Sequence, residues 1–155
     1  MNNIAHYLQE HIVGEATAST DIRRHFANDA SILTIIPSCV VYPRSENDIR
    51  KTARFAWQLA ERGKVVPITS RGLGSDTGGA AIGSGILLIF AAHLNRILSL
   101  DPRRKNVEIE PGINYEKLQQ TLFTHGLFLP PYPSSSQFST VGGAIANNAM
   151  WRKIA

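Results

Sequence analysis

Two stretches near the start of the chain repeat apolar residues at the spacing of a helix. Gly14 ends the first stretch, residues 3–13, whose apolar and aromatic side chains fall on one side: Ile4, Tyr7, Leu8 and Ile12. The second stretch follows Ser19, a residue that suits an N-cap, and carries Ile22 and Phe26. The pattern predicts one helix over residues 3–13 and a shorter helix after Ser19.

A longer helix is predicted to begin after Ser45 and to run to about Arg62. Ser45, followed three positions later by Asp48, resembles a capping box, and Gly63 stands where a helix commonly ends. We expect the buried side of this helix to consist of Ile49, Thr52, Ala53, Ala56, Leu59 and Ala60.

Short apolar runs bounded by turn residues predict strands at 40–42, 65–69, 86–90, 97–101, 107–110 and 127–129. The basic turn at 102–106 makes the fourth and fifth of these an antiparallel pair. Asn114 can cap a further helix that ends at Gly126 and carries on one face Tyr115, Leu118, Leu122 and His125.

A glycine-rich loop separates the predicted strands 65–69 and 86–90. Six of the chain's twelve glycines fall between Gly72 and Gly85. Glycine lets the backbone approach a ligand closely, and successive N–H groups in such a turn form a concave anion site. The loop also carries donors that suit a phosphate, at Ser70, Arg71, Ser75 and Thr77. We hypothesise that it binds a diphosphate; an ordinary glycine-rich hairpin loop is the alternative.

Two common phosphate motifs do not fit this loop. A P-loop requires Gly-Lys followed by Ser or Thr, but the single Gly-Lys, at residues 63–64, is followed by Val65. A Rossmann turn requires Gly-x-Gly-x-x-Gly before a helix, whereas Gly78 comes one residue late. Residues 78–85 are also a poor helix opening, because glycine costs about 1 kcal/mol in a helix.

A second segment suits an anionic ligand by another mechanism. Three prolines keep residues 130–140 extended, which alone would be typical of a linker, but residues 141–149 follow at once and are nearly all small. A helix beginning near Gly142 would offer free N–H groups beside the hydroxyls of Ser139 and Thr140. Two separated sites of this kind suit a long ligand with a diphosphate near its middle.

Composition narrows the class of protein. The 155 residues suit one domain or two small subdomains, and 43% hydrophobic with 18% charged residues is typical of a soluble protein. A net charge of +4 without strong basic clusters argues against nucleic acid. The N-terminus does not resemble a signal peptide, and the lone Cys39 excludes a disulfide or a cysteine-built metal site. We expect a cytoplasmic protein with no metal site and Cys39 in the core.

Three motifs in order carry a resemblance to a known family. They are residues 71–79 (Arg-Gly-Leu-Gly-Ser-Asp-Thr-Gly-Gly), the Glu-Pro-Gly at 110–112, and residues 139–149. Together they resemble the FAD-binding domain of the vanillyl-alcohol-oxidase (PCMH-type) flavoproteins, most of all the branch of D-lactate dehydrogenase and glycolate oxidase. The resemblance covers roughly residues 28–149.

The resemblance implies an α+β fold of two small subdomains with FAD between them, the second one incomplete. It divides the chain into an N-terminal helical segment (1–38), a first subdomain (39–95) and a second (96–155). It implies contacts to FAD from the loop residues Ser70, Arg71, Gly72, Leu73, Gly74, Ser75 and Asp76. From the second segment it implies Pro131, Tyr132, Ser139, Thr140, Gly142, Gly143 and Asn147.

The sequence departs from the family in two places. Some relatives attach FAD covalently through a histidine of the first loop, where this chain has Ser75, so non-covalent FAD is expected. The family also continues well past the Asn-Asn-Ala at 147–149, so the chain resembles an N-terminal part without the catalytic groups or substrate ligands. We therefore assign no catalytic residue, and expect His93 and His125 to be structural.

The resemblance thus implies the FAD-binding part of an oxidoreductase that oxidises a 2-hydroxy acid by hydride transfer to the flavin. Two alternatives stay open. One is a stand-alone nucleotide-binding or interaction module without redox chemistry. The other is a chain that associates with further copies through an unfinished sheet edge.

Overall fold

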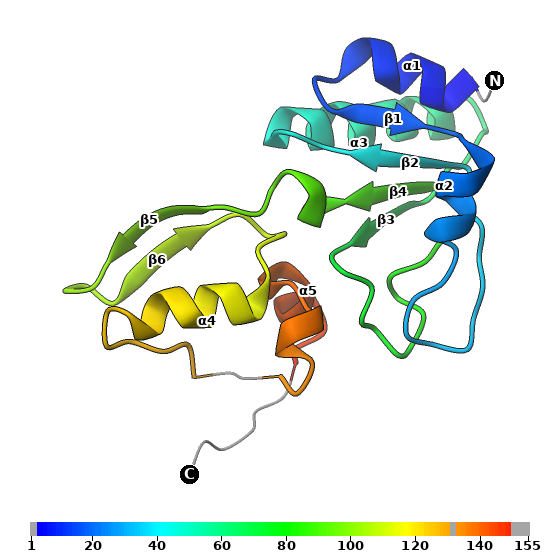
Figure 1. The fold of residues 1–155 in the computed structure, drawn as a ribbon. Helices are drawn as coiled ribbons and strands as arrows, with labels where there is room; N and C mark the ends of the chain where they lie inside the picture. Colours follow the sequence, from blue (N-terminus) through cyan, green and yellow to red (C-terminus); the bar gives the residue numbers. More distant parts are fainter. Residues whose placement is uncertain (1–2, 131–132, 150–155) are drawn as a thin grey trace.

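The computed structural model describes residues 3–130 and 133–149. Figure 1 shows two units, one built around a sheet and the other formed by a β-hairpin beside helices. The first unit runs from α1 to β4 and the second from β5 to α5. This is the α+β architecture that the sequence predicts. In the described part of the chain, no helix is both long and apolar enough to cross a bilayer.

The first unit contains a four-stranded sheet of order β1-β2-β4-β3. The parallel strands are β2 (Cys39–Tyr42), β4 (Ile86–Ile89) and β3 (Ile68–Arg71), while β1 (Glu15–Thr17) is antiparallel to β2. Sequence reasoning missed β1, because three residues are too few to show an alternating pattern. Since β3 and β4 are parallel, the glycine-rich segment crosses from one end of the sheet to the other, and the hairpin alternative is wrong.

The strand before the loop begins three residues later than predicted. Val65 is 80% exposed and does not belong to the core, whereas Val66 is partly buried against it. Pro67 contributes only its carbonyl, which accepts the N–H of Ile86 at 2.9 Å. The shift places Ser70 and Arg71 inside β3 and delivers them to the beginning of the loop.

Helices cover both faces of the central strands. Residues of α1 (Asn3–His11) and α3 (Glu46–Glu61) pack with Cys39, Val41, Ile86 and Leu88. On the other face, α2 (Thr20–His25) and the residue after it, Phe26, pack with Val40, Leu87 and Ile89. Burial on both faces explains why β2 and β4 are apolar throughout rather than alternating.

Cys39 is fully buried in this core, as predicted. Burial raises the pKa of its thiol to about 12, so the thiol stays protonated at neutral pH. An inert core residue is the consequence.

The predicted N-cap of α3 is present, but the acidic residue of the expected capping box, Asp48, bonds other backbone groups. Ser45 caps the helix, and its Oγ accepts the N–H of Asp48. The buried Asp48 carboxylate does not return to Ser45 and instead accepts the N–H groups of Val13 (2.9 Å), Gly14 (3.0 Å) and Arg44 (2.9 Å). It therefore joins the start of α3 to the turn between α1 and β1.

Other helix predictions are confirmed in part. In α3, Thr52 and Ala56 are buried, whereas Ala53 and Ala60 are exposed. The buried side runs through Asp48, Thr52 and Ala56, which are spaced four residues apart. Gly63 ends α3 with a φ of +76°. Ser19 is the N-cap residue of α2, but its side chain makes no capping hydrogen bond.

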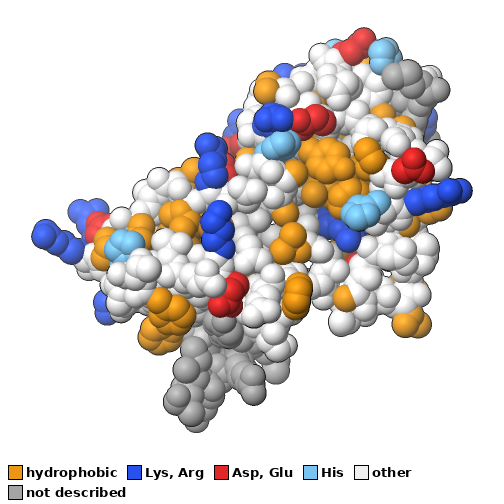
Figure 2. Space-filling view, viewed as in Figure 1, with side chains coloured by type: hydrophobic (Ala, Val, Ile, Leu, Met, Phe, Trp, Pro, Cys, Tyr) orange, Lys and Arg blue, Asp and Glu red, His pale blue; other side chains and the backbone are white. Residues whose placement is uncertain are grey.

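The second unit is a hairpin packed against a helix. β5 (Ile97–Asp101) and β6 (Asn106–Ile109) pair antiparallel as predicted, and α4 (Tyr115–Phe123) is capped by Asn114, whose side chain accepts the N–H of Lys117. The hairpin tip carries basic residues (Figure 2), and elsewhere on the face shown Lys and Arg stand scattered. This distribution does not form a basic stripe of the kind that tracks nucleic acid.

Two predictions after α4 are wrong. His125 lies beyond the helix end and is exposed rather than on the apolar face. Residues 127–129 do not form a strand, because the side-chain amide of the buried Gln119 forms hydrogen bonds with both the N–H and the carbonyl of Leu129. Its Oε1 accepts the N–H at 2.9 Å and its Nε2 donates to the carbonyl at 2.8 Å.

The Glu-Pro-Gly turn at 110–112 connects the two units. The carboxylate of Glu110 is held by Arg96, which donates through Nη2 (2.9 Å) and Nε (3.2 Å). Gly112 donates its N–H to the carbonyl of Leu94 at 2.7 Å, and a side chain there would overlap the carbonyl of Phe90. Pro111 accepts the N–H of Gly142 at 2.9 Å. The turn therefore positions the last helix against the first unit.

Candidate functional site

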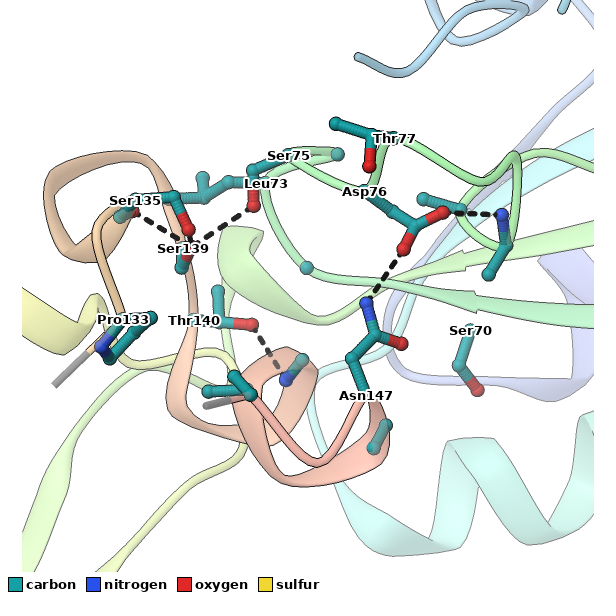
Figure 3. A pocket seen from close by; sticks show the side chains of 18 of the residues that line it. Ser70, Leu73, Ser75, Asp76, Thr77, Pro133, Ser135, Ser139, Thr140 and Asn147 are labelled. Atoms are coloured by element: carbon teal, nitrogen blue, oxygen red, sulfur yellow. Dashed lines mark hydrogen bonds between the residues drawn. The ribbon is translucent and has the colours of Figure 1, made fainter. Parts of the chain in front are cut away.

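A cleft of about 660 Å³ lies where the two units meet (Figure 3). Its walls come from β3, the glycine-rich loop, residues 133–140 and α5 (Val141–Ala146). The structure thus brings together two segments that are far apart in the sequence. The predicted site residues that line the cleft are Ser70, Gly72, Leu73, Gly74, Ser75, Asp76, Ser139, Thr140, Gly143 and Asn147.

Direct contacts join the two segments. The hydroxyl oxygens of Ser75 and Ser139 lie 3.0 Å apart, and Asn147 Nδ2 donates to Asp76 Oδ1 at 2.7 Å. Gly72 packs so closely on Thr140 that a Cβ at position 72 would overlap the Thr140 hydroxyl. The two glycine-bearing segments therefore form a single site, as the sequence hypothesis requires.

The loop offers unused backbone donors. Among the described residues, no intramolecular acceptor is found for the N–H groups of residues 72–77. The donors just beyond are used, because the N–H groups of Gly78 and Ala80 both bond Asp76 Oδ2 at 2.8 Å. Gly74 has a φ of +77°, a conformation that favours glycine. A run of N–H groups without an intramolecular acceptor is what the anion site predicted from the sequence requires.

The prediction of free N–H groups at the last helix is wrong. α5 begins at Val141 with Thr140 as its N-cap, and every N–H of its first turn has an acceptor inside the protein. Val141 and Gly142 donate to the carbonyls of Ile113 and Pro111, and Gly143 and Ala144 donate to Thr140. The neighbouring loop already satisfies this helix end, so it provides small side chains and a close backbone rather than an anion site.

Arg71 and Gly142 are not among the residues lining this cleft. Gly142 packs against Pro111, where a larger side chain would be crowded. The Arg71 guanidinium is buried and donates to the carbonyls of Asn28 (2.9 Å) and Ala81 (3.1 Å). Burial lowers its pKa, and the nearby Asp29 opposes that shift. Two further predicted residues, Pro131 and Tyr132, lie outside the described residues.

Sequence reasoning missed part of the second wall. Ser135 lines the cleft, and its hydroxyl lies 2.7 Å from that of Ser139. Ser139 donates to the carbonyl of Ser135 at 2.8 Å, and since a hydroxyl has one proton, it accepts from Ser75 and Ser135. The run of three serines at 134–136 was the available signal for this hydroxyl cluster.

Among the residues that the structure describes, Asp76 is the one carboxylate that lines the cleft. Its pKa is lowered by the N–H of Ala80, then by Gly78 and Asn147, against partial burial. These donors occupy both carboxylate oxygens, so the negative charge of Asp76 is compensated by hydrogen bonds within the protein. Asp76 therefore shapes the loop without using the N–H groups of the residues before it.

The two histidines considered as bases lie away from this cleft. His93 Nε2 contacts Glu15 Oε2 at 2.8 Å, and Glu15 also pairs with Arg44. His125 Nδ1 lies 3.0 Å from the carbonyl of Thr121. Neither of these two histidines is among the residues that line the cleft, and a structural role for both stays a prediction.

Comparison with known proteins places these features in a family. Residues 37–152 match the family model described as "FAD binding domain". The chain is 34% identical over 149 residues to D-2-hydroxyglutarate dehydrogenase of Escherichia coli, covering 96% of this chain and 14% of that protein. It is 31% identical over 115 residues to glycolate oxidase subunit GlcD of Bacillus subtilis, covering 74% of this chain and 23% of that protein.

The fold has solved counterparts. An alkyldihydroxyacetonephosphate synthase structure superposes with a TM-score of 0.80 at 22% identity, covering 97% of this chain and 30% of that one. This likeness supports the fold alone. The chain spans only about a seventh to a quarter of the curated relatives above, by the 14% and 23% shares. From the family match over residues 37–152, the chain belongs to the FAD-binding domain family of flavoproteins.

Proposed function

We propose that the cleft binds FAD non-covalently, with the diphosphate against the loop 70–76 and the flavin side against residues 139–147. The free N–H groups of residues 72–77 carry this proposal, since they face no acceptor within the described chain while their neighbours do. A diphosphate oxygen accepts strong, charge-assisted hydrogen bonds from such groups. The cleft volume of about 660 Å³ lies in the range usual for cofactor sites.

The small residues of α5 contribute shape rather than charge. Gly143 and Ala144 line the cleft and leave room for a flat ring to approach the backbone. The side chains of Ser139, Thr140 and Asn147 border the same space. Their part is to orient a planar group and to exclude water from one of its sides. We propose the same role for the neighbouring Gly142, Pro131 and Tyr132.

Ser75 stands where some relatives attach the cofactor, and a serine hydroxyl lacks the imidazole needed for that bond. We therefore propose a dissociable cofactor. After loading with FAD, acid precipitation should leave the yellow colour in the supernatant. Flavin that stays with the precipitated protein would contradict the proposal.

We propose that the whole protein oxidises a 2-hydroxy acid. The support is the similarity to a D-2-hydroxyglutarate dehydrogenase and a glycolate oxidase subunit. FAD, when bound, supplies the hydride acceptor for such chemistry. The described residues bind and orient it, and we assign none of them a catalytic role. We further propose a cytoplasmic location and the division into an N-terminal segment (1–38), a first subdomain (39–95) and a second subdomain (96–155).

The direct test is reconstitution of the 155-residue chain with FAD. A visible flavin spectrum after removal of excess ligand, and a higher melting temperature with FAD than with FMN, ATP or NAD, are expected, because a ligand held by the native state raises stability. Equal shifts with ATP and NAD would favour a general nucleotide-binding module. No flavin absorbance and no shift would overturn the proposal.

Self-association is a separate proposal that rests on the sheet. In the described residues the sheet of the second unit has two strands, β5 and β6, and an unpaired edge of such a sheet can pair with another chain. A mass of 17.0 kDa by size exclusion with light scattering would reject it, and a concentration-dependent larger mass would support it.

A further inference from the structure

The strongest unexplained feature is a cation buried behind the diphosphate loop. Arg71 ends β3 with only 8% of its surface exposed, an unusual burial for arginine. Within the described residues no carboxylate oxygen lies within 4.0 Å of its guanidinium. Asp29 is close enough to influence it, but its own oxygens accept the N–H groups of Ser31 and Ala81.

The guanidinium contacts the loop near its end and in its middle, and it also bonds a residue outside the loop, Asn28. Its Nη1 donates to the carbonyl of Asn28 at 2.9 Å and to that of Ala81 at 3.1 Å, close to where the loop re-enters the fold. A Cβ at Gly74 would overlap its Nη2, so the group packs directly against the backbone of that residue. On another side, the ring of Phe26 lies 5.4 Å from its Cζ.

The loop itself separates Arg71 from the main cleft. Leu73, Gly74 and Ser75 line both that cleft and a second hollow of about 500 Å³, whereas Arg71 lines only the second one. A ligand held by the N–H groups on the cleft side would therefore meet the loop backbone, with the cation behind it. A buried charge without an ion pair is costly, and an anion nearby offsets that cost.

We infer that Arg71 is a positioning residue for the diphosphate, shaping the loop from behind and adding positive charge to the site without touching the ligand. This inference rests on the proposed function. It differs from a ligand role, in which the guanidinium fork would bond the phosphate oxygens directly. It also differs from a purely structural role, because the charge acts only on ligands that carry phosphate.

Three ligands separate these roles: FAD, inorganic pyrophosphate, and riboflavin, which has no phosphate. In the 155-residue chain, Arg71→Gln should weaken FAD and pyrophosphate binding about tenfold, the effect of one charge at moderate distance, and leave riboflavin affinity unchanged. Arg104→Gln, at an exposed turn, is the matched control and should change none of them. An equal loss for riboflavin and FAD, or no loss for any ligand, would overturn the inference.

Arg71→Lys keeps the positive charge but loses the planar guanidinium with its several N–H donors. This variant distinguishes the roles if Arg71→Gln does not fold. Binding of pyrophosphate within about threefold of the unsubstituted chain is expected, since a charge that does not touch the ligand acts through its distance and not through its donor geometry. A folded Arg71→Lys that loses pyrophosphate binding more than about tenfold would overturn the inference in favour of direct contact. If the unsubstituted chain binds neither FAD nor pyrophosphate, the proposed function itself fails, and the inference with it.

Discussion

The side-chain amide of Asn147 donates a 2.7 Å hydrogen bond to Oδ1 of Asp76, a residue 71 positions earlier in the chain (Figure 3). Oδ2 of the same carboxylate accepts two backbone N–H groups of the glycine-rich loop. A single side chain therefore fixes the turn of the loop and joins it to the end of α5. We expect cofactor affinity to depend on this link more than overall stability does.

Asn147→Ala tests that link. Asn147 is exposed, so its loss should change the melting temperature little, while FAD affinity should fall about fivefold, the effect of one lost hydrogen bond that orders the site. Gln137→Ala removes an exposed amide side chain from a neighbouring turn that does not line the cleft, and it should leave both quantities unchanged. A titration of flavin fluorescence measures the affinity. Equal behaviour of the two variants would argue against the link.

The contact of Gly72 with Thr140 predicts a non-additive pair of substitutions. Gly72→Ala should destabilise the protein by about 2 kcal/mol, because the new Cβ overlaps the Thr140 hydroxyl. Thr140→Ala should cost about 1 kcal/mol through loss of the α5 N-cap. In the double variant the overlapping hydroxyl is gone and the closest remaining atom, the Cβ of residue 140, is 3.1 Å away.

Urea unfolding of all four proteins measures this coupling. The loss of unfolding free energy in the double variant should be about 1 kcal/mol smaller than the sum of the losses in the two single variants. This is the usual size of an interaction between touching residues. Strict additivity would show that the two segments do not touch in solution.

Gly74 and Gly78 form a matched pair within the loop. Gly74→Ala places a side chain at a φ of +77° and against the Arg71 guanidinium, so we expect a loss of about 2 kcal/mol and little FAD binding. At Gly78 the closest atom to a new Cβ would be Asp76 Oδ2 at 3.4 Å, and Gly78→Ala should be tolerated. Melting temperature and FAD absorbance of the two variants check this. A tolerated Gly74→Ala would contradict the packing of Arg71 described above.

Local patterns predicted most of the elements and the convergence of the two segments. The periodic stretches gave α1 and α3, the turn at 102–106 gave the β5–β6 hairpin, and the glycine-bearing segments line one cleft. These features depend on residues close in sequence, or on small residues that a close approach requires. Such information is present in a single chain.

What the sequence did not predict depends on partners that are distant in the chain. The carbonyls of Pro111 and Ile113 accept N–H groups from the first turn of α5, and no local sequence pattern predicts these bonds. Gln119 replaces a strand at Leu129 because its amide is buried beside that residue. Arg71 has the residue type of a phosphate ligand, and only the tertiary contacts with Asn28 and Ala81 show that it holds the loop.

Asp48 predicts how the fold responds to acid. Burial alone would raise its pKa, but the backbone N–H groups of Val13, Arg44 and Gly14 outweigh burial and lower it. A carboxyl whose pKa is lower in the folded state stabilises the protein above its unfolded pKa of about 3.9, and this contribution is lost as the pH falls through the lower, folded value. Asp48→Ala should therefore lower the free energy of unfolding at pH 7 by about 3 kcal/mol, since three N–H groups lose a charged acceptor.

Glu46→Ala is the control for Asp48→Ala, because Glu46 lies in the same first turn of α3 with its side chain 77% exposed. Its surface ion pair with Arg50 is worth under about 1 kcal/mol, so stability should change little. Urea unfolding from pH 7 down to pH 3 measures both effects. The unsubstituted chain and Glu46→Ala should lose stability below about pH 4, while Asp48→Ala should show a flatter dependence in that range. An equally steep acid dependence in Asp48→Ala would mean that other carboxylates govern it.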